Sequence, residues 1–141
     1  ESGNPIAIAK ANAIIENHSG MSAHAGWLVS VIKKVDLPNC GTLPDFGRTF
    51  NFDMGNGRQY DPYKGIAELM PFAKDVSAKT RKFDARGNDT EIDFRRMMKV
   101  VVDSGYRGYV GIEYSSRQAD TEINGIRMTK RLLEKVREEL S

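Results

Sequence analysis

The stretch Gly41-Thr42-Leu43-Pro44-Asp45-Phe46-Gly47 guides the interpretation of this sequence, because a short apolar run in it stops abruptly at a carboxylate. Three other apolar runs stop in the same way, at Glu16-Asn17-His18, at Ser77-Ala78-Lys79 and at Glu113-Tyr114. A helical pattern follows each of the four runs. In a parallel α/β protein the carboxyl ends of the strands meet in one crevice, so groups far apart in sequence are expected in a single site.

The hydrophobic pattern divides the chain into four βα units. Strands are predicted at about 13–17, 40–44, 74–79 and 108–114. The helices that follow them are predicted to begin at Ser22 or His24, at Asp61-Pro62, at a capping box Thr90–Asp93, and after Thr121. Alternating strands and helices favour a parallel sheet with crossover helices. The piece at 6–11 is expected to be a helix end or a lead-in.

Each predicted helix has apolar residues at helical spacing, which are expected to face the core. These positions are Trp27, Leu28, Val31, Ile32 and Val35; Ile66, Leu69 and Met70; Phe94, Met97, Met98, Val101 and Val102; and Ile123, Ile126, Leu132, Leu133, Val136 and Leu140. The long loop from Phe46 to Tyr60 is rich in Gly, Asn and aromatic residues. A loop of this length in a compact domain is usually functional or mobile.

The composition is that of one globular domain. The chain has 141 residues, of which 40% are hydrophobic. Its 21 basic and 19 acidic residues nearly balance, so neither nucleic acid nor a membrane is an expected partner. The lone Cys40 excludes an internal disulfide framework and is expected to be a small buried residue. We therefore expect a cytoplasmic protein.

Carboxylates at three strand ends are the candidate metal ligands. Glu16, Asp45 and Glu113 would each be costly to bury without a partner, and a cation or a substrate in the crevice would supply one. The alternatives are an ion pair to a neighbouring unit for Glu16 and Glu113, and an Asx turn for Asp45. Three carboxylates at equivalent strand ends predict a divalent-metal site.

Two basic residues near these strand ends are candidate substrate contacts. The candidate roles of His18 are metal ligand, proton shuttle and substrate contact. The alternative is a loop histidine without a functional role. Lys79 ends a strand, where it neutralises an anionic substrate or intermediate, or else is solvated. By contrast, His24 is expected to be structural, and the Arg81-Lys82 pair is expected on the solvated surface.

Four segments together resemble the sugar phosphate isomerase/epimerase family, which has the xylose-isomerase-like TIM-barrel fold. They are Ile15–His18, Gly41–Gly47, Val76–Lys79 with Phe83-Asp84, and Gly108–Tyr114. The resemblance runs over nearly the whole chain from about Ala13. A TIM barrel has eight βα units. The resemblance therefore implies an α/β half barrel in which residues 1–141, as a single domain, supply the last four strands, with helices on the outer face of the sheet.

The resemblance also implies a metal site at the mouth of the barrel. Carried over, its ligands are Glu16, Asp45 and Glu113, and the metal is Mn or Mg, with Zn as a further possibility. The histidine expected as another ligand falls at Ser77, a departure that lowers metal affinity or leaves the position to His18 or water. A second departure is Ser115-Ser116, where an acidic residue and Gly are expected.

The chemistry implied by the resemblance is proton transfer next to a carbonyl of a keto sugar or sugar phosphate. Glu16 and Glu113 would remove and return the proton through an enediolate, with His18 and Lys79 contacting the substrate. The resemblance is equally compatible with a fragment of such an enzyme. The main alternative is a catalytically inactive half barrel that self-associates or pairs with another chain, such as a missing N-terminal half. Phosphodiester cleavage, as in endonuclease IV, is disfavoured by the presence of only two His residues and by the near-neutral charge.

Overall fold

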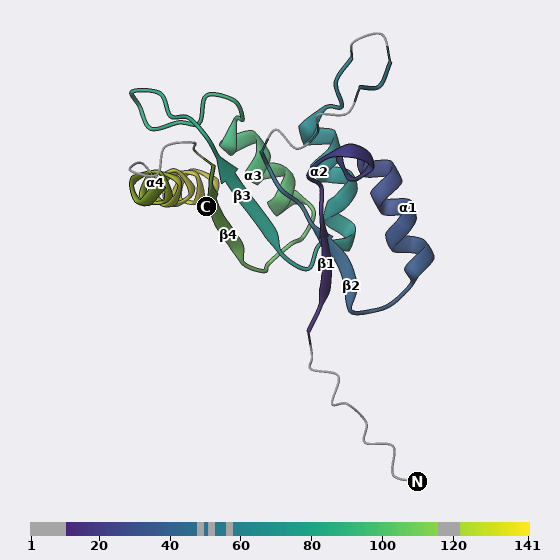
Figure 1. Ribbon diagram of the computed structural model, residues 1–141. Helices are drawn as coiled ribbons and strands as arrows, with labels where there is room; N and C mark the ends of the chain where they lie inside the picture. Colours follow the sequence, from purple (N-terminus) through teal and green to yellow (C-terminus); the bar gives the residue numbers. More distant parts are fainter. Residues whose placement is uncertain (1–10, 48–49, 51–52, 56–57, 116–121) are drawn as a thin grey trace.

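The computed structural model describes residues 11–47, 50, 53–55, 58–115 and 122–141, so most of the 6–11 lead-in, part of the 46–60 loop and Ser116 lie outside it. Strands and helices alternate as predicted (Figure 1). The elements are β1 (Ala13–Glu16), a 3-10 turn (Gly20–Ala23), α1 (Ala25–Val35), β2 (Cys40–Leu43), α2 (Pro62–Leu69), a 3-10 turn (Met70–Phe72), β3 (Val76–Thr80), α3 (Phe94–Asp103), β4 (Val110–Tyr114) and α4 (Glu122–Leu140).

The four strands lie parallel in the order of the sequence. β1 pairs with β2, and β3 pairs with β4, both in parallel register. Two isolated parallel bridges, Thr42–Ala73 and Asp45–Ser77, connect the two pairs. At the second of them the Ser77 amide donates to the Pro44 carbonyl over 2.9 Å. The sheet therefore runs β1-β2-β3-β4, as expected for consecutive units of a TIM barrel.

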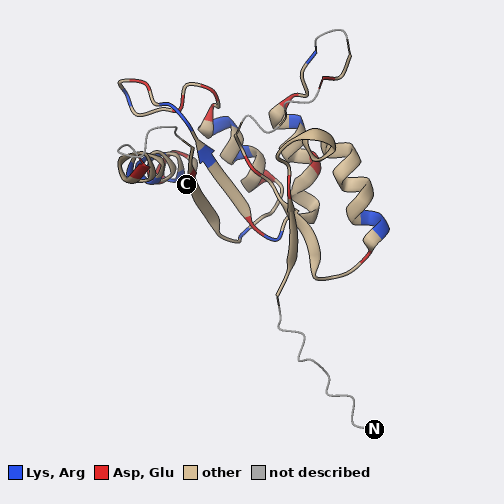
Figure 2. Ribbon diagram, in the orientation of Figure 1, with Lys and Arg blue, Asp and Glu red and all other residues tan. Residues whose placement is uncertain are grey.

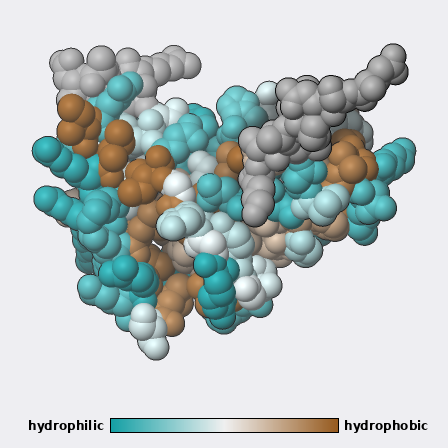
Figure 3. All heavy atoms as spheres, turned by 90° about the horizontal axis from the view of Figure 1, so that it is seen from below, coloured by the Kyte–Doolittle hydropathy of each residue, from teal (hydrophilic) through white to brown (hydrophobic). Residues whose placement is uncertain are grey.

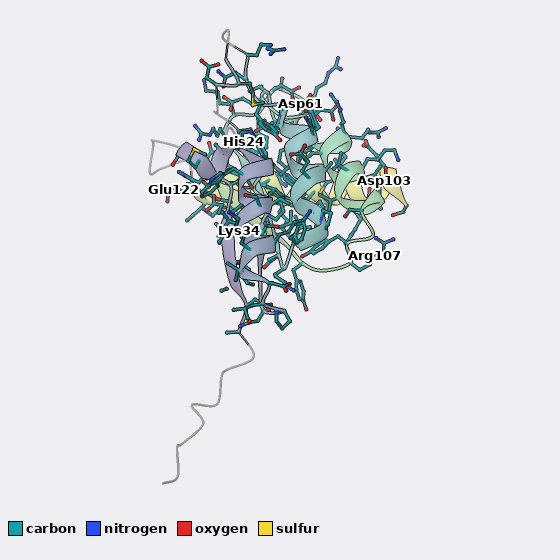
Figure 4. The ribbon with its side chains drawn as sticks, turned by 90° about the vertical axis from the view of Figure 1, so that its right-hand side faces the viewer. His24, Lys34, Asp61, Asp103, Arg107 and Glu122 are labelled. Carbon is teal, nitrogen blue, oxygen red and sulfur yellow. The ribbon has the colours of Figure 1, made fainter. Side chains whose placement is uncertain are left out.

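The helices begin at the end of the sheet where the strands stop. His24 and Asp61, the N-caps of α1 and α2, lie at the same end of the molecule, and Lys34 lies further down α1 (Figure 4). The Asp61 carboxylate accepts from the Lys64 amide over 3.0 Å, and Pro62 is the first residue of α2, as predicted. The loops at this end are therefore the ones that follow each strand and form the mouth of the fold.

Part of the predicted core is exposed. Leu28, Ile66 and Leu69 are fully buried against the sheet side of the helices. Five positions predicted to be buried have 40–68% of their surface exposed, so those predictions are wrong: Trp27, Val35, Val102, Ile123 and Ile126. The reason is geometric. Only a narrow stripe of each helix contacts this sheet or the next helix, and residues on the flanks of that stripe face outward.

The start of α3 also differs from the prediction. Thr90 was expected to open a capping box, but the N-cap is Asp93, which accepts from the Arg96 amide over 3.0 Å. The residues before it form a separate turn, because the Asp89 carboxylate accepts from two backbone amides, those of Glu91 and Ile92, at 2.8 and 2.9 Å. An Asx-type turn thus competes with the capping box for the same segment.

The fold is half of a barrel, and its two outer strands are β1 and β4. Within the described residues each of them pairs with one neighbour only. Apolar side chains near these strands are exposed: Ile14 by 42%, Ile112 by 38% and Ile126 by 46%. Seen from below, apolar residues form a band on the side of α4 and β4 (Figure 3). Among the described residues, no helix is both long and apolar enough to cross a bilayer.

Candidate functional site

Three carboxylates from three different strand ends converge. Glu16 is the last residue of β1, Asp45 follows β2, and Glu113 lies near the end of β4. One oxygen from each lies within 4.8 Å of the others. The structure therefore brings together the residues that the sequence proposes as metal ligands, although Glu16 and Glu113 are 97 positions apart in the sequence.

Asp45 is fully buried and fixed by the backbone around it. Its Oδ1 accepts from the Gly47 amide over 2.7 Å, which is the Asx turn considered as an alternative role. The side chain of Asn17, also fully buried, bonds both backbone groups of Asp45, at 2.8 and 3.0 Å. Asn17 thus joins the end of β1 to the end of β2. It was not singled out from the sequence, where its position directly after Glu16 was the available signal.

Lys79 lies among the three carboxylates. Its Nζ is 2.7 Å from Glu113 Oε1, 3.2 Å from Asp45 Oδ2 and 4.0 Å from Glu16 Oε1. Only 6% of its side chain is exposed, so the solvated alternative is wrong. The end of β3 is basic in Figure 2 because Arg81 and Lys82 follow Lys79. An ion pair with neighbouring units, considered for Glu113 and Glu16, is thus present for Glu113 and at the distance limit for Glu16.

Burial and neighbouring charges shift the pKa values of Asp45 and Lys79. The pKa of Asp45 is raised to about 7, mainly by burial and then by the adjacent Glu16 carboxyl, which together outweigh the lowering effects of the Gly47 amide and Lys79. Burial lowers the pKa of Lys79, but its hydrogen bond to Glu113 and the charges of Asp45 and Glu113 outweigh burial and raise it. Lys79 is therefore held as an ammonium ion.

The oxygens of Glu16, Asp45 and Glu113 are possible ligands for a divalent metal. The three oxygens suit Mn²⁺ or Mg²⁺, and Glu16 Oε1 is buried without a hydrogen-bond partner in the described structure. Ser77, at the position of the expected histidine, donates instead to Glu113 Oε2 over 3.2 Å. One ammonium charge faces three carboxyl groups. The residues therefore fit a metal, but the ion would compete with Lys79.

The two histidines lie apart from this cluster. His18 is exposed, and its amide donates to Ser22 Oγ over 3.1 Å. In the described structure the cluster includes no histidine, so His18 does not fill the position of Ser77. Its role as a substrate contact stays a prediction. His24 is structural, as expected: its Nδ1 accepts from the Trp27 amide over 3.0 Å.

Arg81 and Cys40 differ from their expected environments. Arg81 was expected on the solvated surface with Lys82, but it is half-buried, and its Nε is buried. Lys82 is exposed as expected. Cys40 is only partly buried and packs against the edge of the core. The difference for Arg81 arises because strand alternation continues one residue past β3 and turns this side chain to the same side as Lys79.

The chain matches the family described as "Xylose isomerase-like TIM barrel" over residues 5–138, and it therefore belongs to that family. A similar solved structure is the crystal structure of a xylose isomerase domain protein from Planctomyces limnophilus, with a TM-score of 0.64 and 12% identity. The alignment covers 91% of this chain and 47% of that chain, so this chain spans about half the length of the solved protein. At this identity the likeness supports the fold alone. No curated protein matches the chain.

Proposed function

We propose that this member of the xylose isomerase-like TIM-barrel family is a metal-dependent isomerase or epimerase of keto sugars, or the metal-bearing part of one. The observation that carries the proposal is the convergence of Glu16, Asp45 and Glu113 to within 4.8 Å at the mouth of the fold. A carboxylate set at the carboxyl ends of barrel strands is where this fold carries its catalytic groups.

Glu16, Asp45 and Glu113 would hold the metal, which we propose to be Mn²⁺ or Mg²⁺. Bound there, the metal would polarise the substrate carbonyl and so acidify the hydrogen on the neighbouring carbon. Asp45 is the most rigid of the three ligands because Asn17 and Gly47 fix it from both sides. Glu113 is oriented by Ser77 and Lys79.

Glu16 and Glu113 are the proposed acid and base. One carboxylate takes the proton from the carbon next to the carbonyl and leaves an enediolate. The other carboxyl returns a proton to the opposite face of the same carbon, giving an epimer, or to the neighbouring carbon, giving an isomer. The Lys79 ammonium lies 2.7 Å from Glu113, and once a metal replaces it at the carboxylates it would be available to contact the substrate and stabilise a developing oxyanion.

Titration with Mn²⁺ tests this proposal. The wild type is expected to bind Mn²⁺, and a Glu16→Gln/Glu113→Gln variant is expected to lose at least about tenfold in affinity, because two anionic ligands become neutral. The matched control is Glu122→Gln/Glu138→Gln, which removes two exposed carboxylates of α4. Equal Mn²⁺ affinity in the wild type and the Glu16/Glu113 variant would reject the metal assignment.

A second candidate role is assembly. The edges of β1 and β4 have one partner strand each in the described structure, and apolar residues beside them, such as Ile112 and Ile126, are exposed. Unpaired strand edges promote association. We propose that these edges join a second copy of the chain or another half barrel, which would leave the protein either catalytically complete or purely structural.

Native mass spectrometry with an activity assay separates the two roles. A stable monomer that isomerises keto sugars would exclude the assembly role. A dimer without Mn²⁺ binding would favour a structural half barrel. An Ile112→Lys variant places a charge beside the exposed edge of β4 and is expected to weaken any dimer. Lys34→Glu, on the outer side of α1, serves as a charge-change control.

A further inference from the structure

A pocket adjoins the carboxylate cluster and has one basic side chain, Arg81, in its described lining. Its volume is about 840 Å³, and it lies between the loops that follow β2 and β3. The described lining residues are Gly47, Phe50, Gln59, Tyr60, Pro62, Arg81, Glu91 and Ile92. Gly47 connects this pocket to the cluster, because its amide donates to Asp45, and a Cβ on it would lie 2.6 Å from Lys79 Cδ.

Arg81 is the charged side chain of this pocket for which the described residues supply no hydrogen-bond or ion-pair partner. Its Nε is buried and has no hydrogen-bond partner, and its guanidinium makes no ion pair with any residue in the described structure. Glu91, the carboxylate in the lining, is exposed and has an interaction of its own. A guanidinium stays charged at any physiological pH, so leaving it half-buried and unpaired is costly unless an anion binds there.

The backbone that carries Arg81 is fixed in advance. The Arg81 amide donates to Asp89 Oδ2 over 3.1 Å. The segment beyond it folds back on itself, with the Thr90 amide donating to the Lys82 carbonyl over 3.0 Å and a bridge between Phe83 and Asp89. A preordered cation costs less to use in binding than one on a free chain.

Arg81 lies a short distance along the chain from Lys79, which contacts the proposed catalytic carboxylates. Lys79 and Arg81 are two positions apart on one side of the extended chain, about 7 Å along it. That separation is comparable to the length of a ketose. We propose that Arg81 binds the anionic end group, a phosphate ester or a carboxylate, of a keto sugar whose reacting carbons lie against Glu16 and Glu113. This inference rests on the proposed function of the cluster.

Three sugars that differ only at C6 test the inference by calorimetric titration: D-fructose, D-fructose 6-phosphate and D-fructuronate. The wild type is expected to bind one of the anionic sugars more tightly than fructose, and which one identifies the end group. Arg81→Met is expected to weaken that binding about ten- to a hundredfold, as for loss of a charged hydrogen-bonded pair, with little effect on fructose. Arg81→Lys should keep the charge but lose the bidentate geometry, so its loss should be smaller.

Arg86→Met is the matched control, because it removes the same charge from an exposed position in the same loop and should leave the binding of all three sugars unchanged. Thermal unfolding of each variant checks the fold, and the comparison of Arg81→Lys with Arg86→Met remains informative if Arg81→Met unfolds. A wild type that binds neither anionic sugar more tightly than fructose overturns the proposal. So does an Arg81→Met variant that weakens all three sugars equally.

The outcome is separable from that of the metal assignment. Binding is measured without turnover, both with and without Mn²⁺. Arg81-dependent binding of an anionic sugar by a protein that takes up no Mn²⁺ would support the anion pocket and reject the metal site. Mn²⁺ binding through Glu16 and Glu113, with no effect of Arg81→Met on the binding of the anionic sugars, would support the metal site and reject the anion pocket.

Discussion

The two faces of β3 carry polar side chains in different ways. On the helix-facing side, Thr80 Oγ1 lies 2.6 Å from Thr129 Oγ1, and Thr129 in turn donates to the Gly125 carbonyl over 2.8 Å. On the inner side, Lys79 is a single ammonium ion among three carboxyl groups, and the buried Nε of Arg81 has no hydrogen-bond partner among the described residues. Paired polar groups hold the fold together. An excess of carboxyl groups over cations and a buried guanidinium nitrogen without a hydrogen bond both indicate a ligand, because these charges are otherwise not fully compensated.

The largest effect on stability is expected in the hydrophobic core between the sheet and the helices. Ile66 is fully buried in α2, so Ile66→Ala should lower the free energy of unfolding by about 2–5 kcal/mol through lost burial and a residual cavity. Urea unfolding followed by circular dichroism measures the change. Val102→Ala is the control, because Val102 is 41% exposed and should change stability by less than about 0.5 kcal/mol. Similar losses for both variants would contradict the assignment of the two faces of the fold.

Lys79→Met tests the inner side. Removing the ammonium leaves the fully buried Asp45 and the partly exposed Glu113 without their cation, and should lower stability by about 2–3 kcal/mol in the absence of metal. The same change removes the competitor for a divalent ion, so Mn²⁺ should raise the unfolding temperature of the variant more than that of the wild type. Lys82→Met removes an exposed neighbouring charge as a control. An equal or smaller Mn²⁺ effect in Lys79→Met would show that Lys79 and the metal do not compete.

Gly47→Ala tests how closely the two parts of the site approach. A Cβ at this position would lie 2.6 Å from Lys79 Cδ and 3.2 Å from Asp45 Oδ1, so Lys79 has to move. We expect a loss of about 1–2 kcal/mol in the free energy of unfolding. Gly111→Ala is the matched control within the sheet, where the nearest atom would lie at 3.4 Å. Equal stability of the two variants would mean that Lys79 can leave its position without cost.

The residues between the sheet and the helices were largely predictable from the sequence, because hydrophobic periodicity indicates which side of a helix or strand is buried. The four βα units and the convergence of strand ends also follow from their order, since parallel strands end at one edge. The exposed residues Ile123 and Ile126 escaped prediction. Periodicity marks them as apolar but does not indicate whether this chain supplies the surface that would cover them.

The inner side was less predictable, because it depends on strand register and pleat. Glu16, Asp45 and Glu113 could be proposed from their positions alone. Two features depend on the exact residue at which the alternation of β3 begins: Lys79 lies among the carboxylates, and Arg81 is partly buried while Lys82 is exposed. Asn17 was missed for a related reason: its contacts with Asp45 join two strands whose register the sequence does not give.

The smallest expected effect concerns the paired threonines. Thr80→Val or Thr129→Val alone should lower stability by about 1 kcal/mol, because each leaves the other buried hydroxyl with one partner fewer. The double variant should lose less than the sum of the two, since it removes both hydroxyls and keeps the shape. A double-mutant cycle in urea measures this coupling. If the losses simply add, the two hydroxyls contribute independently, and paired contacts on this side of β3 would no longer distinguish it from the inner side.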